Sequence, residues 1–170
     1  MKRILKIFLP LVSALLILPS CTKEEEVRQP ADILGVWALS EYSYFEFCKE
    51  YELRHLEVEY TGDGIALGIW SKDVYYYEPG YNLVIYLSGE KAADVYQIVT
   101  MTDEKLTWCP VDHVEITDAD SAGKMIGEII EKAQEGYKLD PALYQSFRKL
   151  SQEEFFRILE DLGIYYPWIY

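Results

Sequence analysis

Few side chains in this sequence have the types and spacing that catalysis or metal binding requires. His55, Glu57 and Glu59 alternate along a predicted strand and could share a face, which is a conceivable cation site. The chain has only 2 histidines and no second cluster of ligands, so a solvated outer face is the simpler interpretation. Residues 118–123 begin like a calcium-binding loop, but Ala122 and Ile129 replace two of its oxygen ligands. We therefore predict no metal site and no cofactor.

The signatures of the common enzyme classes are also missing from the sequence. There is no nucleophile elbow, phosphate-binding loop or zinc-protease helix. With 29 acidic residues, pairs of carboxylates are expected by chance, so such pairs do not indicate a glycosidase. We predict that the protein is not an enzyme.

Tyrosine is abundant, with 15 copies in 170 residues. A tyrosine combines a large apolar ring with a polar tip, which suits surfaces that bind ligands or partners. The candidates for ligand contact lie on the third to sixth predicted strands: Trp70, Tyr75, Tyr77, Tyr86 and Tyr96. The alternative is that these rings form barrel wall and contacts to the C-terminal helices. A shift of one residue along a strand reverses the face of each side chain, so both interpretations stay open.

The first 20 residues have the pattern of a cleaved export signal. Three basic residues precede an apolar run over 7–18, which is shorter than the roughly 20 residues of a membrane-spanning helix. The run ends in Leu18-Pro19-Ser20-Cys21, which resembles the lipobox of bacterial lipoproteins. The resemblance implies that residues 1–20 are removed and that Cys21 carries a lipid. An ordinary signal peptide with a chance cysteine is the alternative.

Residues 21–32 are predicted to be an acidic tether between the lipid and the folded protein. Three glutamates at 24–26 resemble the signal that sends lipoproteins of some Gram-negative groups to the outer face of the outer membrane. A solvated spacer is the alternative. Thr22, in place of Asp after the cysteine, resembles the enterobacterial sorting rule for the outer membrane. The expected localisation is the outer membrane, facing the cell exterior, with the lipid as the membrane contact.

The composition of the mature chain limits its partners and indicates that it folds. Removal of residues 1–20 leaves 13 basic and 29 acidic side chains, a net charge of −16, which repels nucleic acid and anionic membranes. An aromatic content of 15% predicts a folded chain, because disordered chains are poor in aromatics.

Cys48 and Cys109 could form a disulfide outside the cytoplasm or remain two separate buried thiols.

The hydrophobic pattern divides the mature chain into two parts. Residues 33–116 contain seven or eight short alternating segments separated by turn sequences, which predicts an antiparallel sandwich or barrel. The first of these strands is predicted to be long and bent, over 37–47. Residues 117–170 have helical periodicity, with helices expected over 118–136, 141–150 and 151–163. The apolar end of the chain, 164–170, is expected to dock on the rest.

Short motifs in the first part resemble the lipocalin-like domains of secreted bacterial lipoproteins. They are Gly35-Val36-Trp37, the hairpin Thr61-Gly62-Asp63-Gly64, and the late segment at 103–108. The resemblance implies a mainly β fold: an antiparallel lipocalin-like barrel over 33–116, covered by a C-terminal helical layer over 117–170. It also implies that Trp37 packs across the closed end of the barrel, often against an arginine, for which Arg148 and Arg157 are the candidates.

The expected function is non-catalytic binding of a small apolar or amphipathic ligand in the barrel mouth. The alternative is an interaction module of the cell envelope that contacts a protein or glycan while its barrel is filled. The composition of the barrel interior separates the two, because interlocking large side chains leave no cavity.

A Cys21→Ser substitution tests the lipid anchor. We expect the variant to lose acylation and to remain uncleaved or become soluble, because serine offers no thiol for the lipid. Metabolic labelling with a fatty acid and membrane fractionation measure both effects. Variant protein that is still membrane-bound after removal of the signal would contradict the prediction.

Overall fold

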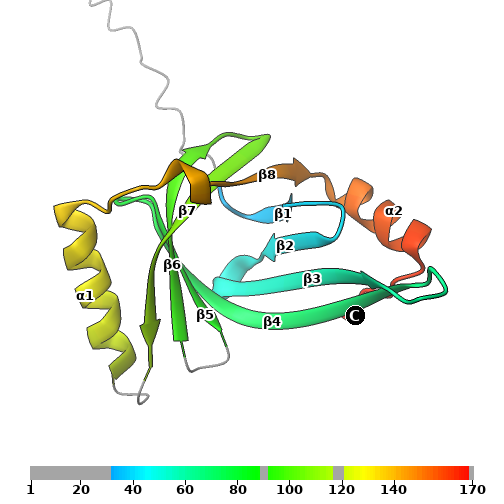
Figure 1. Cartoon of the computed structure of the whole chain (residues 1–170), viewed down its shortest axis with the longest axis horizontal. Helices are drawn as coiled ribbons and strands as arrows, with labels where there is room; N and C mark the ends of the chain where they lie inside the picture. The colour runs from blue at the N-terminus through cyan, green and yellow to red at the C-terminus, as the bar shows by residue number, and fades with distance from the viewer. Residues whose placement is uncertain (1–31, 89–91, 117–120, 169–170) are drawn as a thin grey trace, which may run out of the picture. The chain divides into compact units, whose positions relative to one another are not determined.

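The computed structural model describes residues 32–88, 92–116 and 121–168 (Figure 1). The signal segment, Cys21 and most of the predicted tether lie outside these residues. Eight antiparallel strands form one closed barrel in sequence order, which confirms the predicted mainly β fold class. The strands are β1 Gly35–Ala38, β2 Ser43–Phe47, β3 Glu52–Tyr60, β4 Ala66–Glu78, β5 Leu83–Ser88, β6 Ala92–Met101, β7 Lys105–Glu115 and β8 Gln145–Leu150. The α-helices are α1 Ser121–Glu135 and α2 Gln152–Leu162.

The prediction of a helix over 141–150 is wrong. Only a 3₁₀ turn, Pro141–Leu143, forms there, and Gln145–Leu150 is the strand that closes the barrel. β8 pairs with β1 on one side and with β7 on the other. Without β8, β1 and β7 would each expose a row of unpaired backbone groups, so sheet closure overrides the local helical spacing. The barrel therefore extends beyond residue 116 and takes its last strand from the segment predicted to be helical.

The predicted long first strand is also two strands. β1 and β2 pair with each other across a turn at residues 39–42, and Gly35 lies opposite Phe47. Glu41 and Ser43 interrupt the apolar alternation, and the backbone reverses at this interruption. The reversal lets Trp37 and Phe45, which are directly opposite, face the interior together.

Large side chains fill the barrel interior. The buried members are Ile33, Trp37, Phe47, Leu53, Tyr75, Val84, Ile98, Leu106, Trp108 and Phe147. Trp37 is fully buried and donates its indole hydrogen to the carbonyl oxygen of Ile33 at 2.7 Å. The cation over its ring is neither Arg148 nor Arg157, because the Nζ atom of Lys149 lies 4.9 Å from the ring centroid. The cationic partner of Trp37 therefore comes from the closing strand.

The two α-helices cover two different outer faces of the barrel (Figure 1). Met125 and Ile129 of α1 pack on Leu83, Ile85 and Val95 of β5 and β6. Phe155 and Leu159 of α2 pack with β1–β3 side chains, and the docked C-terminal residues Ile164 and Tyr166 complete this cluster. The predicted capping box of α2 is present, and Gly163 ends the helix in the left-handed conformation. Neither helix is long and apolar enough to cross a membrane, among the residues described.

A Phe155→Ala substitution tests whether α2 is an integral part of the barrel. Phe155 is 1% exposed, and its loss leaves a cavity, so we expect the free energy of unfolding to fall by about 3–5 kcal/mol. Urea denaturation followed by Trp fluorescence measures the change. Arg157→Ala, at an exposed position of the same helix, serves as the control and should have an effect below about 0.5 kcal/mol. Equal effects of the two substitutions would show that α2 packs only loosely.

Candidate functional site

The five side chains proposed for ligand contact do not surround one opening. Tyr75, Tyr77, Tyr86 and Tyr96 belong to the interior cluster of the barrel. Trp70 faces outward, where its ring packs at 4.9 Å from the Trp168 ring and its indole donates to the carbonyl of Tyr165 at 3.1 Å. Trp70 therefore anchors the C-terminal segment to β4.

Most of the interior tyrosines have structural contacts. Tyr75 is 4% exposed, and Tyr96 stacks on Trp108 with a centroid distance of 4.5 Å. The Tyr86 hydroxyl donates to a carboxylate oxygen of Asp73 at 2.7 Å, and burial is the main cause of the raised pKa of Tyr86. Tyr75 also packs edge-on against Phe47, and Phe47 in turn contacts Trp108, as expected of a filled barrel.

His55 lies on the inner face of β3, whereas the sequence favoured a solvated outer face for this residue. Its ring stacks on Phe45 with a centroid distance of 4.2 Å and shares a hydrogen bond of 3.0 Å with the Ser43 hydroxyl. Burial lowers the pKa of His55, although Glu57 opposes the shift. Within the described residues, no group of three or more His, Cys, Asp or Glu side chains is arranged to hold a metal ion.

A small pocket opens where the chain enters the barrel and where β2 connects to β3. We call it the tyrosine pocket, after Tyr51, Tyr75 and Tyr77, and its volume is about 320 Å³. Two of the predicted ligand residues, Tyr75 and Tyr77, therefore share a pocket with a third ring. The remaining lining residues are Asp32, Ile33, Leu34, Lys49 and Glu50.

The backbone beside this pocket is strained. Glu50 and Tyr51 have φ values of 63° and 65°, a left-handed backbone conformation that residues other than glycine seldom adopt. This conformation lets the Tyr51 ring, which is 58% exposed, lie 6.4 Å from the ring centroids of both Tyr75 and Tyr76. Such strain costs about 1–3 kcal/mol per residue and occurs preferentially at functional sites. The exposed ring and the strained backbone together make this pocket a candidate site.

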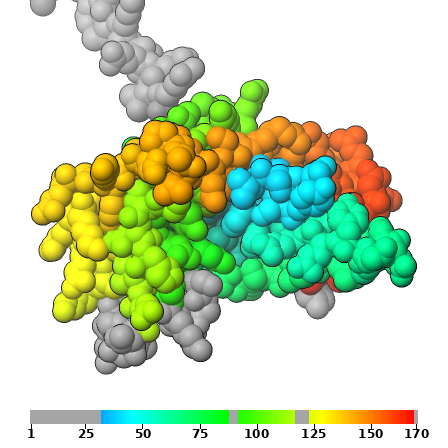
Figure 2. Space-filling model, viewed as in Figure 1, coloured from blue at the N-terminus to red at the C-terminus, as the bar shows by residue number. Residues whose placement is uncertain are grey.

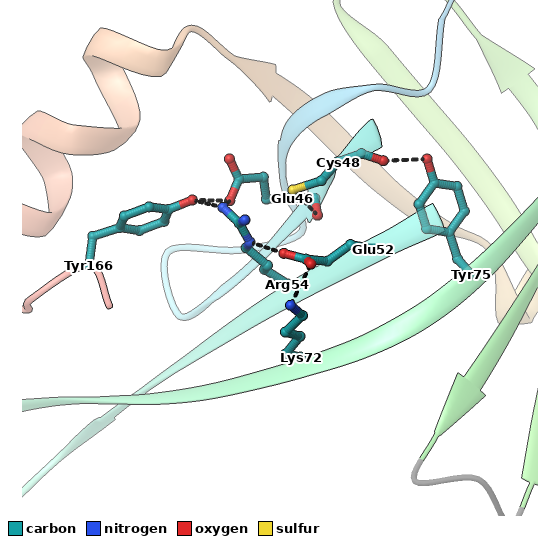
Figure 3. Close-up of polar contacts among 7 residues, drawn as sticks. All are labelled: Glu46, Cys48, Glu52, Arg54, Lys72, Tyr75 and Tyr166. Carbon is teal, nitrogen blue, oxygen red and sulfur yellow. Dashed lines mark hydrogen bonds and ion pairs between the residues drawn. The ribbon is translucent and has the colours of Figure 1, made fainter. Parts of the chain in front are cut away.

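Two hydrogen bonds hold the β2–β3 connection in place. The Tyr75 hydroxyl donates to the carbonyl oxygen of Cys48 at 3.0 Å (Figure 3). The amide of Cys48 donates to the carbonyl of Glu52 at 2.8 Å. Burial raises the pKa of the Cys48 thiol to about 11, so the thiol is neutral at physiological pH and is a poor nucleophile. Cys48 thus acts here through its backbone.

Beyond this connection, an ion network on the outer face of the barrel surrounds Arg54 (Figure 3). Its guanidinium pairs with Glu52 at 2.6 Å and with Glu46 at 3.3 Å, and lies 4.8 Å from the ring centroid of Trp168. The Tyr166 hydroxyl contacts both Arg54 and Glu46. The hydrogen bond from Lys72 is the main cause of the lowered pKa of Glu52, and Arg54 adds to it. The network joins the C-terminal segment to β2 and β3.

The two remaining cysteines are free thiols in different surroundings. Cys48 is half-buried beside the Arg54 network, whereas Cys109 is buried, with its Sγ atom 3.6 Å from the carbonyl oxygen of Asp140. The two thiols are thus separate in the structure, and only Cys109 is fully buried.

A second pocket, of about 730 Å³, lies over β1, β8 and the start of β7. It contains none of the predicted ligand residues. Its charged groups are of both signs, with Lys105 and Arg148 beside Glu41 and Glu104, and Arg148 is already paired with Glu154 at 3.4 Å. The tyrosine pocket is therefore the better candidate, because predicted residues and a strained backbone coincide there.

No protein-family model, curated protein or solved structure matches this chain. The candidate site therefore depends on its geometry alone. Sequence reasoning missed Tyr51 and Arg54: no glycine marks the left-handed positions at 50 and 51, and no local pattern connects Arg54 with a tyrosine 112 residues later.

An Arg54→Ala substitution tests the network that supports the site. It leaves Glu46 without its cation and Glu52 with Lys72 alone, so we expect a loss of about 2–4 kcal/mol in the free energy of unfolding. Tyr166→Phe, which removes only the hydroxyl, should cost about 1 kcal/mol. Chemical denaturation measures both values. An Arg54→Ala variant as stable as the parent protein would show that the C-terminal segment docks through apolar contacts alone.

Proposed function

We propose that this chain is a lipid-anchored, non-catalytic binding module of the outer membrane that binds a neutral glycan at the tyrosine pocket. In this proposal the barrel is a filled scaffold, and the site lies on the surface. The single observation that favours this function is the exposed ring of Tyr51, whose backbone has a positive φ and which lines the pocket with Tyr75 and Tyr77.

The filled interior favours this function over a ligand in the barrel mouth. Ten buried side chains, including Trp37, Trp108 and two phenylalanines, occupy the space that a carrier would leave for its ligand. Two of the interior tyrosines that were candidates for ligand contact already have partners within the barrel, because Tyr96 stacks on Trp108 and the Tyr86 hydroxyl donates to Asp73.

The chemistry of the pocket suits a sugar. Tyrosine rings pack against the apolar C–H faces of a pyranose, while Asp32, Lys49 and Glu50 supply acceptors and a donor for its hydroxyls. A volume of about 320 Å³ is at the small end for ligand sites and fits a single ring. The net charge of −16 that remains after removal of residues 1–20 disfavours anionic polysaccharides, so the expected glycan is neutral.

The proposed anchor would place the pocket near the membrane. Asp32 follows Cys21 by eleven positions, which span at most about 40 Å when fully extended. A tether of this length would hold the pocket among glycans at the outer membrane surface.

Titration of neutral mono- and disaccharides, followed by aromatic fluorescence and NMR, tests this function. We expect binding by at least one sugar, and a Tyr51→Ala substitution should weaken it about tenfold, since a ring contact contributes about 0.5–1.5 kcal/mol beyond its area. Tyr165→Ala is the matched control, because Tyr165 is 74% exposed and lies outside the pocket. The proposal fails if no neutral sugar binds or if both variants bind equally. Binding of a fatty acid weakened by Tyr96→Ala would instead support a carrier.

A further inference from the structure

One strand of the barrel has an uncovered edge. β4 runs from Ala66 to Glu78 and pairs with β3 over 66–74, but it pairs with β5 only over 74–78. Within the described residues, positions 66–73 therefore have a strand neighbour on one side only. Figure 1 shows this part of the β3–β4 hairpin extending beyond β1 and β2, and Figure 2 shows it at the surface.

The hydrogen-bond pattern identifies which backbone groups point outward from this edge. The amide of Val58 donates to Tyr42, away from β4, so Val58 and Gly68 face each other without exchanging hydrogen bonds. The hairpin closes with a bond from the Thr61 amide to the Ile65 carbonyl, which fits the same alternation. The backbone N–H and C=O groups of Ala66, Gly68 and Trp70 are therefore directed toward the open edge.

Two aliphatic side chains are exposed along the same edge. Leu67 is 49% exposed and Ile69 is 48% exposed, and the two share one face of β4 because they are two residues apart. A long edge with exposed aliphatic residues is a site for pairing with another strand. Lys72 is the one charged residue on the outer face of this stretch, and Glu52 pairs with it at 2.5 Å.

We propose that the β4 edge pairs with the β4 edge of a second copy of this chain, antiparallel about a two-fold axis at Gly68. In this register Ala66 lies opposite Trp70 of the other copy, and Gly68 lies opposite Gly68. Each of these three facing pairs has its backbone groups directed at the other strand, so about six hydrogen bonds form. Leu67 lies opposite Ile69 in both halves, at the non-hydrogen-bonded positions where side chains approach most closely.

The acidic charge of the protein does not prevent this pairing. The carboxylates on that face that lie next to Leu67 and Ile69 are Glu59 and Glu57, directly opposite them on β3. Asp73, further along β4 on the same face, is bound to the Tyr86 hydroxyl at 2.7 Å. In the dimer the two β3 strands are separated by three strand spacings, about 14 Å, which exceeds the Debye length of about 8 Å at physiological ionic strength. Repulsion between these groups is therefore largely screened, and the dimer should strengthen as salt is added.

Sedimentation velocity over a range of protein concentrations tests the pairing. We expect a concentration-dependent dimer, and the double substitution Leu67→Lys with Ile69→Lys should weaken it at least tenfold because it places like charges on facing strands. Val99→Lys is the control, since Val99 is an exposed residue on β6, away from this edge. Both variants should keep the unfolding midpoint of the parent protein.

Cysteine cross-linking tests the register. A mixture of the Leu67→Cys and Ile69→Cys proteins should oxidise to the mixed disulfide dimer faster than either protein alone, because these positions face each other only about the Gly68 axis. A protein that stays monomeric, or a dimer that the lysine pair does not weaken, would overturn the proposal. Fastest dimerisation of the Ile69→Cys protein alone would overturn the register. None of these variants changes the tyrosine pocket, so glycan binding and dimer formation fail or succeed separately.

Discussion

Pairing of β8 with both β1 and β7 is the constraint on which the rest of the structure depends. β1 is only four residues long, and it acquires a second hydrogen-bonded neighbour from a segment more than 100 residues later. The same strand places Phe147 in the interior and brings Lys149 over the Trp37 ring. Loop closure over such a distance is entropically costly, and the burial of apolar side chains at closure offsets that cost.

Closure leaves the barrel with apolar side chains on both faces of many strands. Val84 faces the interior, whereas its neighbours Leu83 and Ile85 are fully buried under α1. Such strands are covered by a helix outside and by interlocked rings inside, so little of their surface is free to bind a ligand. The surface that remains free lies at connections and edges, such as the strained β2–β3 connection and the unpaired part of β4.

The Arg54 network fixes the position of the C-terminal segment on the barrel. Apolar packing of Ile164 and Tyr166 would hold the segment against β3 and β4 without fixing its position along the strands. Directional bonds from Arg54 to Glu46 and Glu52, with the Tyr166 hydroxyl between them, define that position. Gly68 contributes space, since a Cβ atom there would lie 2.5 Å from Ile164.

The sequence by itself determined the local features of this protein: the alternation of β3, the turn at 61–64, the apolar stripe of α1 and the capping box of α2. These features depend on residues that are near each other in the chain. Only the tertiary structure decided the conformation of residues 145–150. The spacing of Phe147 and Leu150 allows a helix, and hydrogen bonding to β1 and β7 makes the segment a strand. The tertiary structure also decided which way each tyrosine faces, that the Tyr51 ring is exposed, and which residues Arg54 contacts. Those outcomes depend on register and on partners far away in the sequence, and no local pattern encodes them.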